Sequence, residues 1–277
     1  MSICRKSSKK ACNYEVLNNN VDYGTRRIDQ MPLPYCDQQG PYRERVQFSE
    51  RTQRTCKSMT SFYLCACKVI FVGDVSTGKS SLVNRFCRES FDARYPGTIG
   101  VDFEVERFYV LNHAFSLQIW DTAGHERFKC IAQGYYRNTN VIVTVFDMSR
   151  PETLMNARRW LDEAMKLNSE QNVQKFLVGT KMDLLDESTM METQIEATRV
   201  AEEMKAEYWP VSSQTGENVT KLFQRVAALA FDAAVQRSME PNHPVIHPSG
   251  NSLLNLYFLR KEEKIKQRKI RSFCRIN

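Results

Sequence analysis

The 277-residue sequence predicts an α/β fold, a six-stranded, mostly parallel sheet with helices on both faces. Three observations lead to this class. Short apolar runs of strand length alternate with longer segments of helical period. The run VIVTVF (141–146) is β-branched and continuously apolar, as in strands covered on both faces. The first apolar run ends in a glycine-rich loop, and a helix-like segment follows. Strands alternating with helices require right-handed crossovers, which place the sheet between two helix layers.

The first half of this alternation of strands and helices begins at Cys67, where the mainly polar sequence of the preceding residues ends. CKVIFVG (67–73) is the first predicted strand, and SSLVNRF (80–86) is the first predicted helix. VDFEVERFYVL (101–111) and FSLQIW (115–120) are two further strand candidates, separated by a three-residue connection.

After the buried strand at 141–146, the segment 149–165 has the features of a helix start. Ser149 and Glu152 have the spacing of a capping box, and Pro151 suits the first turn. Apolar residues then recur at helical spacing: Leu154, Ala157 and Leu161.

The remaining elements repeat the alternation. KFLVGT (175–180) and YWPVSS (208–213) are predicted strands. The helix between them has one apolar face, formed by Ala197, Val200, Ala201 and Met204. The last helix has the strongest apolar face: Val219, Leu222, Phe223, Val226, Ala227 and Ala230.

Composition divides the chain into three parts. Residues 1–66 are polar and carry a net charge of +5, and we expect a largely disordered extension. Residues 67–236 form the predicted domain. Residues 237–277 are a linker and a polybasic tail, of which 261–277 carry a net +5. The positive charge lies at the ends, so we expect contact with acidic lipid headgroups or proteins, and no nucleic-acid partner.

Other bulk features narrow the class further. The nine cysteines form no disulfide framework or zinc pattern, which favours free thiols in a reducing compartment. No apolar stretch is long enough to span a membrane. The N-terminus lacks the apolar segment of a secretory signal and the glycine needed for myristoylation. We expect a monomer in the cytoplasm.

The strongest motif is GDVSTGKS (73–80), which matches the phosphate-binding pattern G-x-x-x-x-G-K-[ST] with a strand before it and a helix after it. Its glycines allow backbone N–H groups to surround phosphate oxygens at a helix N-terminus. Lys79 is expected to reach the outer phosphates and Ser80 to bind Mg²⁺. The predicted phosphate-binding residues are Gly73, Asp74, Val75, Ser76, Thr77, Gly78, Lys79, Ser80 and Ser81.

Two later turns complete a nucleotide site. Asp121 ends a strand, where a second acidic group would support the metal ion, and Gly124 can approach the terminal phosphate without a Cβ. In GTKMD (179–183), Asp183 can accept the two donors of the guanine edge, which adenine lacks. Lys181 would cover the base plane, and the Ser213 amide would meet the guanine carbonyl, with Ser212 and Gln214 beside it.

With these motifs in order, residues 67–236 resemble the Rab family of Ras-like small GTPases. The family marks are IGVDF (99–103), LQIWD (117–121), ERFKCI (126–131), YYRNT (135–139) and VFDMS (145–149). The runs ERFKCIA, MKAEYWPVSSQTGENV and RVAALAF are most similar to the Rab-thirty-four/thirty-six branch, which acts in Golgi, lysosome-positioning and ciliary membrane traffic.

The resemblance implies further roles. Thr98 would join the Mg²⁺ shell when the γ-phosphate is present, Phe91 would stack beside the base, and Tyr95 would close over the phosphates. The aromatic positions that face effectors correspond to Phe103, Trp120 and Tyr135. The implied partners are effectors, an exchange factor and a GTPase-activating protein, at the cytoplasmic surface of Golgi or vesicle membranes.

The sequence departs from the family at the catalytic position. His125 stands where relatives have the glutamine that orients the attacking water, beside Gly124 and Thr98. Val75 stands where relatives often have a small residue, and its branched side chain can crowd the water and an arginine finger. We expect slow intrinsic hydrolysis. Alternatively, a GTPase-activating partner supplies the missing groups.

Smaller departures concern the base, the first switch and the tail. Thr180 stands where most relatives have Asn, and Gln214 stands where many have Lys. Pro96 is expected to stiffen the first switch, the loop at about 91–100 that GTP and Mg²⁺ would order. The chain ends in SFCRIN, in which Cys274 has the position, but a poor context, for prenylation. An unmodified, solvated tail is the other interpretation.

Three functions are compatible with these residues. The first is a regulatory GTPase in vesicle traffic that uses Mg²⁺ and alternates between GTP and GDP. The second is a scaffold that holds GTP, barely hydrolyses it and binds effectors constitutively. The third, a P-loop kinase for a small substrate, lacks an arginine-rich lid and is disfavoured by the guanine motif.

Overall fold

The computed structural model describes Thr52, Thr55, Cys56 and residues 65–238, except 96, 112, 126–133 and 169–171. Most of the expected N-terminal extension, the expected tail with Cys274, and Pro96 lie outside these residues. The family mark ERFKCI (126–131) does too. Within the described residues, no helix is both long and apolar enough to cross a membrane.

The predicted six-stranded sheet is confirmed. Its strands, in chain order, are β1 (Cys65–Val72), β2 (Val101–Val110), β3 (His113–Thr122), β4 (Val141–Asp147), β5 (Gln174–Thr180) and β6 (Glu207–Pro210). They are arranged in the spatial order β2-β3-β1-β4-β5-β6. Only β2 and β3 pair in antiparallel fashion, which a short connection allows, and every other neighbouring pair is parallel.

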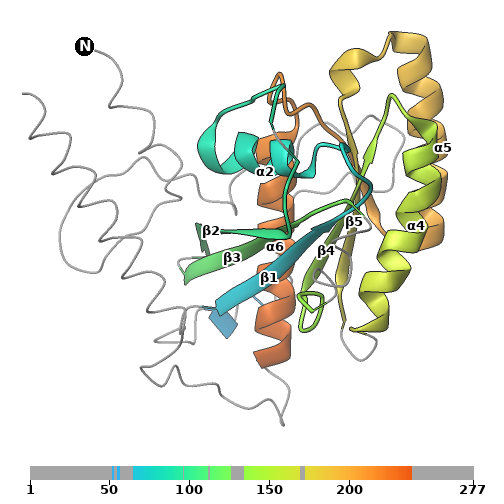
Figure 1. The fold of residues 1–277 in the computed structure, drawn as a ribbon. Coiled ribbons are helices and arrows are strands. Elements are labelled where there is room, and N and C mark those ends of the chain that lie inside the picture. Colours follow the sequence, from blue (N-terminus) through green and yellow to red (C-terminus); the bar gives the residue numbers. More distant parts are fainter. Residues whose placement is uncertain are drawn as a thin grey trace, which may run out of the picture. The chain divides into compact units, whose positions relative to one another are not determined.

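Helices cover both faces of the sheet (Figure 1). The helices are α2 (Lys79–Arg88), α4 (Pro151–Lys166), α5 (Glu187–Met204) and α6 (Val219–Ser238), with a short 3₁₀ helix, η3 (Met182–Leu184). Strand β1 shows how the two faces differ. Ile70 and Val72 belong to the core cluster that includes α4 and α5. Phe71 points to the other face and stacks on Phe223 of α6, with ring centroids 5.7 Å apart.

The second face is an aromatic core. Phe86 of α2 stacks on Phe223 of α6 with ring centroids 3.9 Å apart, and Phe115 of β3 meets Phe231 of α6 edge to face at 5.5 Å. All four rings are buried. Phe86 therefore secures α2, whose N-terminus carries part of the candidate site, against α6, which packs on β1 through Phe71 and on β3 through Phe115.

The parallel strands β1, β3, β4 and β5 end at the same edge of the sheet. β1 ends at the phosphate-binding loop, β3 at Asp121 and Thr122, β4 at Asp147, and β5 at Thr180. The register fixes these ends beside one another, because Phe71 pairs with Asp121 on one side and Val72 with Thr144 on the other. This edge is where ligands bind in open α/β sheets.

The predicted capping box at the start of α4 is wrong. The N-cap residue is Arg150, and no side chain caps the helix. The Ser149 hydroxyl donates instead to Oδ1 of Asp147 at 2.7 Å. A carboxylate at the end of β4 is a stronger acceptor than a neutral group, so it draws Ser149 away from the helix. Pro151 does occupy the first turn, as predicted.

Two ends of the domain differ from the expected boundaries. β1 begins at Cys65 because Cys65 and Ala66 already pair with β3, and α6 continues to Ser238. Further upstream, the buried Thr52 hydroxyl donates to Asp232 Oδ1 of α6 at 2.6 Å. The carbonyl oxygen of Cys56 lies 3.0 Å from Nε2 of His113. Residues before the expected start therefore contact the domain.

Candidate nucleotide-binding site

The phosphate-binding loop begins with a glycine that the sheet itself requires. Gly73 has φ +146°, and a Cβ there would overlap the backbone of Val145 in β4, 3.1 Å from its carbonyl carbon. Gly78 has φ +85° and forms the N-cap of α2. Side chains other than hydrogen are strained in both conformations. The two glycines therefore turn the loop tightly around the N-terminus of α2.

Lys79 lies at the centre of this loop. Its side chain is buried, and Nζ donates to the carbonyl oxygens of Gly73 at 2.9 Å and Asp74 at 2.7 Å. Burial lowers the pKa of Lys79 to about 8, although the charges of Asp121 and Asp74 act in the opposite direction. A buried ammonium with this environment is stabilised by an additional anion, as a phosphate would provide.

Three oxygen-bearing side chains meet beside Lys79. Ser80 Oγ and Thr98 Oγ1 are 2.5 Å apart, and Thr98 Oγ1 lies 3.4 Å from Asp121 Oδ2. The other carboxylate oxygen of Asp121 is buried and has no hydrogen-bond partner among the described residues. Burial raises the pKa of Asp121 to about 6, against the lowering effects of the Ser80 hydrogen bond and the Lys79 charge.

This donor set fits Mg²⁺. Hydroxyl and carboxylate oxygens are the ligands of hard divalent cations. The unpartnered oxygen of Asp121 and the raised pKa both describe a carboxylate that a nearby cation would stabilise. The structure therefore brings together the three residues that the sequence predicted for the metal: Ser80, Thr98 and Asp121.

Gly124 brings the end of the β3 segment against the phosphate-binding loop. A Cβ on Gly124 would lie 2.5 Å from Lys79 Nζ and equally close to the Asp74 carbonyl carbon. Only glycine permits this approach. His125 follows it and lines the same cleft. Val75, on the loop, leaves 48% of its surface exposed and also lines the cleft.

The other end of the cleft holds the residues predicted to bind guanine. Asp183 of η3 accepts a hydrogen bond from the Ser212 hydroxyl, which orients its carboxylate. Arg85 of α2 donates from Nε to the Ser213 carbonyl oxygen at 2.5 Å, and it also donates to the Gln214 carbonyl. This arginine fixes the loop after β6, a role that helical periodicity alone does not reveal.

A single cleft of about 540 Å³ joins the two ends. Most predicted site residues line it: Val75, Ser76, Gly78, Lys79, Ser80, Ser81, Phe91, Tyr95, Thr98, Gly124, His125, Thr180, Lys181, Asp183, Ser213 and Gln214. The structure adds residues that the sequence did not single out: Asp92, Ala93, Gly97, Ile99, Thr122 and Leu184.

Four predicted nucleotide-binding residues are not among those that line the cleft and make other contacts. Gly73 packs against β4. The carboxylate of Asp74 accepts from Asn156 and Trp160 of α4, at 2.8 and 2.7 Å, and therefore anchors the loop. The Thr77 hydroxyl donates to the Asp74 carbonyl at 2.9 Å. Ser212 supports Asp183. Their backbone groups remain part of the loops that surround the cleft.

The three predicted effector-facing aromatics form one cluster. Phe103 and Trp120 are paired directly across β2 and β3, with ring centroids 4.7 Å apart. Trp120 and Tyr135 are 5.1 Å apart. Lys68 Nζ lies 4.9 Å from the Trp120 ring centroid and donates to the Arg137 carbonyl. Tyr135 is 38% exposed, so the cluster reaches the surface.

Comparison with known proteins agrees with this geometry. A sequence model described as the Ras family matches residues 68–232. Human Ras-related protein Rab-36 is 51% identical over 173 residues, which are 62% of this chain and 65% of that protein. Rat Ras-related protein Rab-34 is 54% identical over 173 residues, or 67% of its length. The stretch matched to Rab-36 thus spans less than two thirds of that relative. The predicted resemblance is confirmed, and the chain belongs to the Ras family, within which it is similar to the Rab proteins Rab-34 and Rab-36.

Proposed function

We propose that this chain binds GTP and GDP with Mg²⁺ and acts as a GTP-dependent switch in membrane traffic. One observation carries the proposal. A single cleft is lined by a buried lysine of the phosphate-binding loop and by two hydroxyl ligands for a hard cation, with the Asp121 carboxylate beside them. At its far end the cleft holds an oriented aspartate beside a lysine.

The phosphate end of the cleft provides positive charge and hydrogen-bond donors. Lys79 and the N-terminus of α2 face the same region, so both stabilise the negative charge of phosphate oxygens. Ser80, Thr98 and Asp121 would hold Mg²⁺, which would supply charge neutralisation at the outer phosphates. Thr98 and Gly124 lie on the segments that respond to the γ-phosphate, since each already lies against this region.

The base end selects guanine. The carboxylate of Asp183 accepts the two adjacent donors of the guanine edge, and adenine would leave this acceptor unpaired. Ser212 holds the carboxylate, and Arg85 holds the loop that presents the Ser213 amide. Phe91 and Lys181 line the same end and flank the base.

Hydrolysis in this cleft is slow. A neutral imidazole presents its donor and acceptor in divergent directions, so His125 orients an attacking water less well than a glutamine amide. Val75 exposes a branched side chain to the same cleft and occupies space that the water or an arginine finger needs. A tenfold loss in rate corresponds to only ~1.4 kcal/mol of barrier.

The same two residues favour a second function, a scaffold that retains GTP and binds effectors without cycling. The two functions differ in the lifetime of bound GTP. Two measurements separate the two functions. One is the identity of the nucleotide extracted from purified full-length protein, and the other is the rate at which bound GTP becomes GDP with and without a GTPase-activating protein. A protein that contains mainly GDP, exchanges it for GTP and forms GDP again supports the switch. A protein whose bound GTP persists under both conditions supports the scaffold.

The partners follow from the surface and the termini. The cluster of Phe103, Trp120 and Tyr135 binds effector proteins, and the switch segments near Thr98 and Gly124 bind an exchange factor and a GTPase-activating protein. The basic residues within 261–277 attract an acidic membrane surface, with a lipid on Cys274 as a second anchor. The protein is then a monomer in the cytoplasm, peripheral on Golgi or vesicle membranes.

Isothermal titration calorimetry of the full-length chain tests the proposal. We expect Mg²⁺-dependent binding of GTP and GDP and at least a hundredfold preference over ATP. Asp183→Asn should lose most of this preference. Glu203→Gln, a matched carboxylate-to-amide change in an exposed ion pair on α5, should bind like the wild type. Equal binding of ATP and GTP by the wild type would overturn the proposal.

A further inference from the structure

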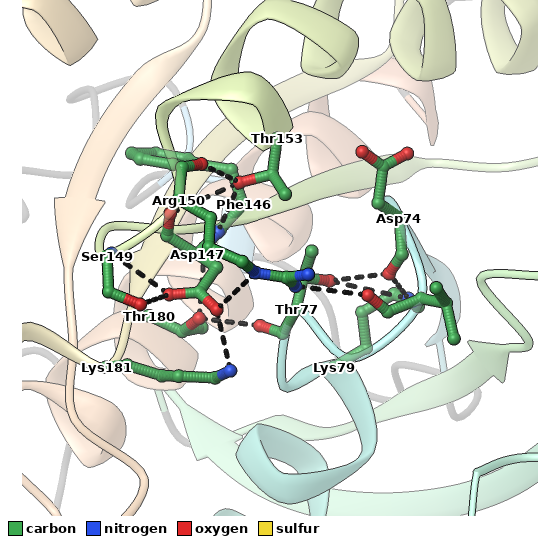
Figure 2. Close-up of polar contacts among 11 residues, drawn as sticks. Asp74, Thr77, Lys79, Phe146, Asp147, Ser149, Arg150, Thr153, Thr180 and Lys181 are labelled. Carbon is green, nitrogen blue, oxygen red and sulfur yellow. Dashed lines mark hydrogen bonds and ion pairs between the residues drawn. The ribbon is translucent and has the colours of Figure 1, made fainter.

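The carboxylate of Asp147 is an interaction centre that the roles described above do not use. Asp147 ends β4, between the phosphate-binding loop and the segment that carries Lys181 (Figure 2). Its side chain is 1% exposed. A buried carboxylate is costly unless it is paired, so its partners are informative about its role.

Among the described residues, the Asp147 carboxylate accepts four hydrogen bonds, all from charged or polar donors. Oδ2 accepts from Lys181 Nζ at 2.6 Å and from Arg150 Nε at 3.0 Å. Oδ1 accepts from the Ser149 hydroxyl at 2.7 Å and from the Ser149 amide at 3.0 Å. Burial raises the pKa of Asp147, but the Lys181 and Ser149 hydrogen bonds outweigh it and the net shift is downward. The group is therefore ionised at neutral pH.

The first consequence concerns Lys181. Its backbone adopts φ +60°, and its ammonium is held 2.6 Å from Asp147, so both ends of the side chain are fixed. The aliphatic stem between them lines the base end of the cleft. Ordering a free lysine side chain on binding costs conformational entropy. The ion pair removes most of this cost before a ligand binds.

The second consequence concerns the phosphate-binding loop. Arg150 donates from Nε to Asp147 (Figure 2). It also donates from Nη2 to the carbonyl oxygen of Val75, at 3.2 Å. The planar guanidinium thus joins the carboxylate to the loop. One buried charge therefore connects the residue that covers the base with the loop that surrounds the phosphates.

We propose that Asp147 is a positioning residue for guanine nucleotides, which fixes the Lys181 stem and, through Arg150, the phosphate-binding loop. This inference rests on the proposed nucleotide binding. This positioning slows the dissociation of GDP and GTP alike. The two nucleotides differ in the γ-phosphate, and neither Lys181 nor Val75 distinguishes them by that group.

Dissociation of a fluorescent GDP and GTP analogue from the full-length protein tests the inference. Asp147→Asn removes the charge and leaves Lys181 and Arg150 with a weaker partner, so both nucleotides should dissociate about tenfold faster. Lys181→Met keeps the stem but removes the ammonium. If Asp147 acts through this ammonium, the dissociation rate of the double variant Asp147→Asn/Lys181→Met should exceed the wild-type rate by less than the product of the two single-variant factors.

Two further measurements distinguish positioning from general loosening. Chelation of Mg²⁺ with EDTA should accelerate dissociation by the same factor in Asp147→Asn as in the wild type, since Asp147 does not contact the cation ligands. Arg150→Gln leaves Asp147 and Lys181 intact and should raise the rate two- to fivefold; it also serves if Asp147→Asn does not fold. Glu203→Gln is the matched control and should dissociate at the wild-type rate.

The inference is overturned by rates for Asp147→Asn within twofold of the wild type. A double variant with Lys181→Met whose rate increase equals the product of the two single-variant factors also contradicts the inference. An unchanged dissociation rate for Arg150→Gln contradicts it as well. In each case a wild type that still binds GDP with Mg²⁺ leaves the proposed function standing. A wild type without Mg²⁺-dependent guanine binding would instead overturn the proposed function.

Discussion

The hydroxyl of Thr180 donates to the backbone carbonyl oxygen of Thr77 at 2.6 Å and so joins the end of β5 to the phosphate-binding loop. It also lies 3.0 Å from the Phe146 carbonyl oxygen. The family resemblance implies that most relatives have a longer asparagine at this position. Thr180 is buried and contacts the loop directly, so a shorter residue still provides a tether.

Thr180→Val should weaken nucleotide binding. Valine has the same shape but no hydroxyl, so the carbonyls of Thr77 and Phe146 lose a buried donor, at about 1–3 kcal/mol. We expect GDP to dissociate about tenfold faster, measured with a fluorescent analogue. Thr180→Ser retains the hydroxyl and should stay within threefold of the wild type. Equal rates for the valine and serine variants would show that the tether has no role.

His125→Gln should accelerate intrinsic hydrolysis. The amide can accept from the attacking water and donate to the transferring phosphate at one flexible tip, which the imidazole does less well. We expect about a tenfold rise in the single-turnover rate of GTP hydrolysis, equivalent to ~1.4 kcal/mol. Val75→Gly should add to it if crowding also contributes. A His125→Gln rate equal to that of the wild type would remove His125 as the cause of slow turnover.

Binding of Mg²⁺ should depend on pH through Asp121. Burial raises its pKa to about 6, so the carboxyl of the nucleotide-free protein carries a proton at lower pH that a cation must displace. The apparent Mg²⁺ affinity should therefore fall up to about tenfold for each pH unit below 6 and change little between pH 6 and 7. Titration of Mg²⁺ against GDP binding from about pH 5 to 7 measures this; a pH-independent affinity would contradict it.

The raised pKa of Asp121 also makes the stability of the nucleotide-free fold depend on pH. Its folded-state pKa of about 6 exceeds the ordinary carboxyl value near ~4. Its contribution to the stability of the nucleotide-free fold is therefore present at the lowest pH and is lost as the pH rises through about 6. Mg²⁺ and nucleotide should restore that stability at neutral pH, because the cation binds the ionised form.

Most residues that the sequence predicted for the nucleotide site line one cleft, because its loops have local signatures. The glycine spacing at 73–78, Asp121 at the end of β3 and Asp183 just after β5 each follow from chemistry within a few residues. Asp147 is also an acidic strand end, and that signal could have identified it. The contacts of Arg150 and Arg85 with the loops could not be found this way, because the Val75 and Ser213 carbonyls that accept them lie 75 and 128 residues away in the chain.

The capping error has the same origin. A capping box is a local pattern, and Ser149 satisfied it in sequence. In the structure Asp147, which is buried at the strand end, competes for the same hydroxyl. Local patterns fail where a tertiary charge offers a better partner. Such failures are therefore most expected beside a functional cleft, where buried charges are concentrated.

Thr52→Val should destabilise the domain, although Thr52 precedes its expected start. The buried hydroxyl donates to the Asp232 carboxylate at 2.6 Å, and valine preserves the volume while leaving that charge with one donor fewer. Gln236 still donates to the other carboxylate oxygen at 2.7 Å. We expect a loss of about 1–2 kcal/mol in urea unfolding of the GDP-loaded full-length chain. Asp232→Asn keeps an acceptor and should cost less. If Thr52→Val unfolds at the wild-type urea concentration, the segment does not stabilise α6.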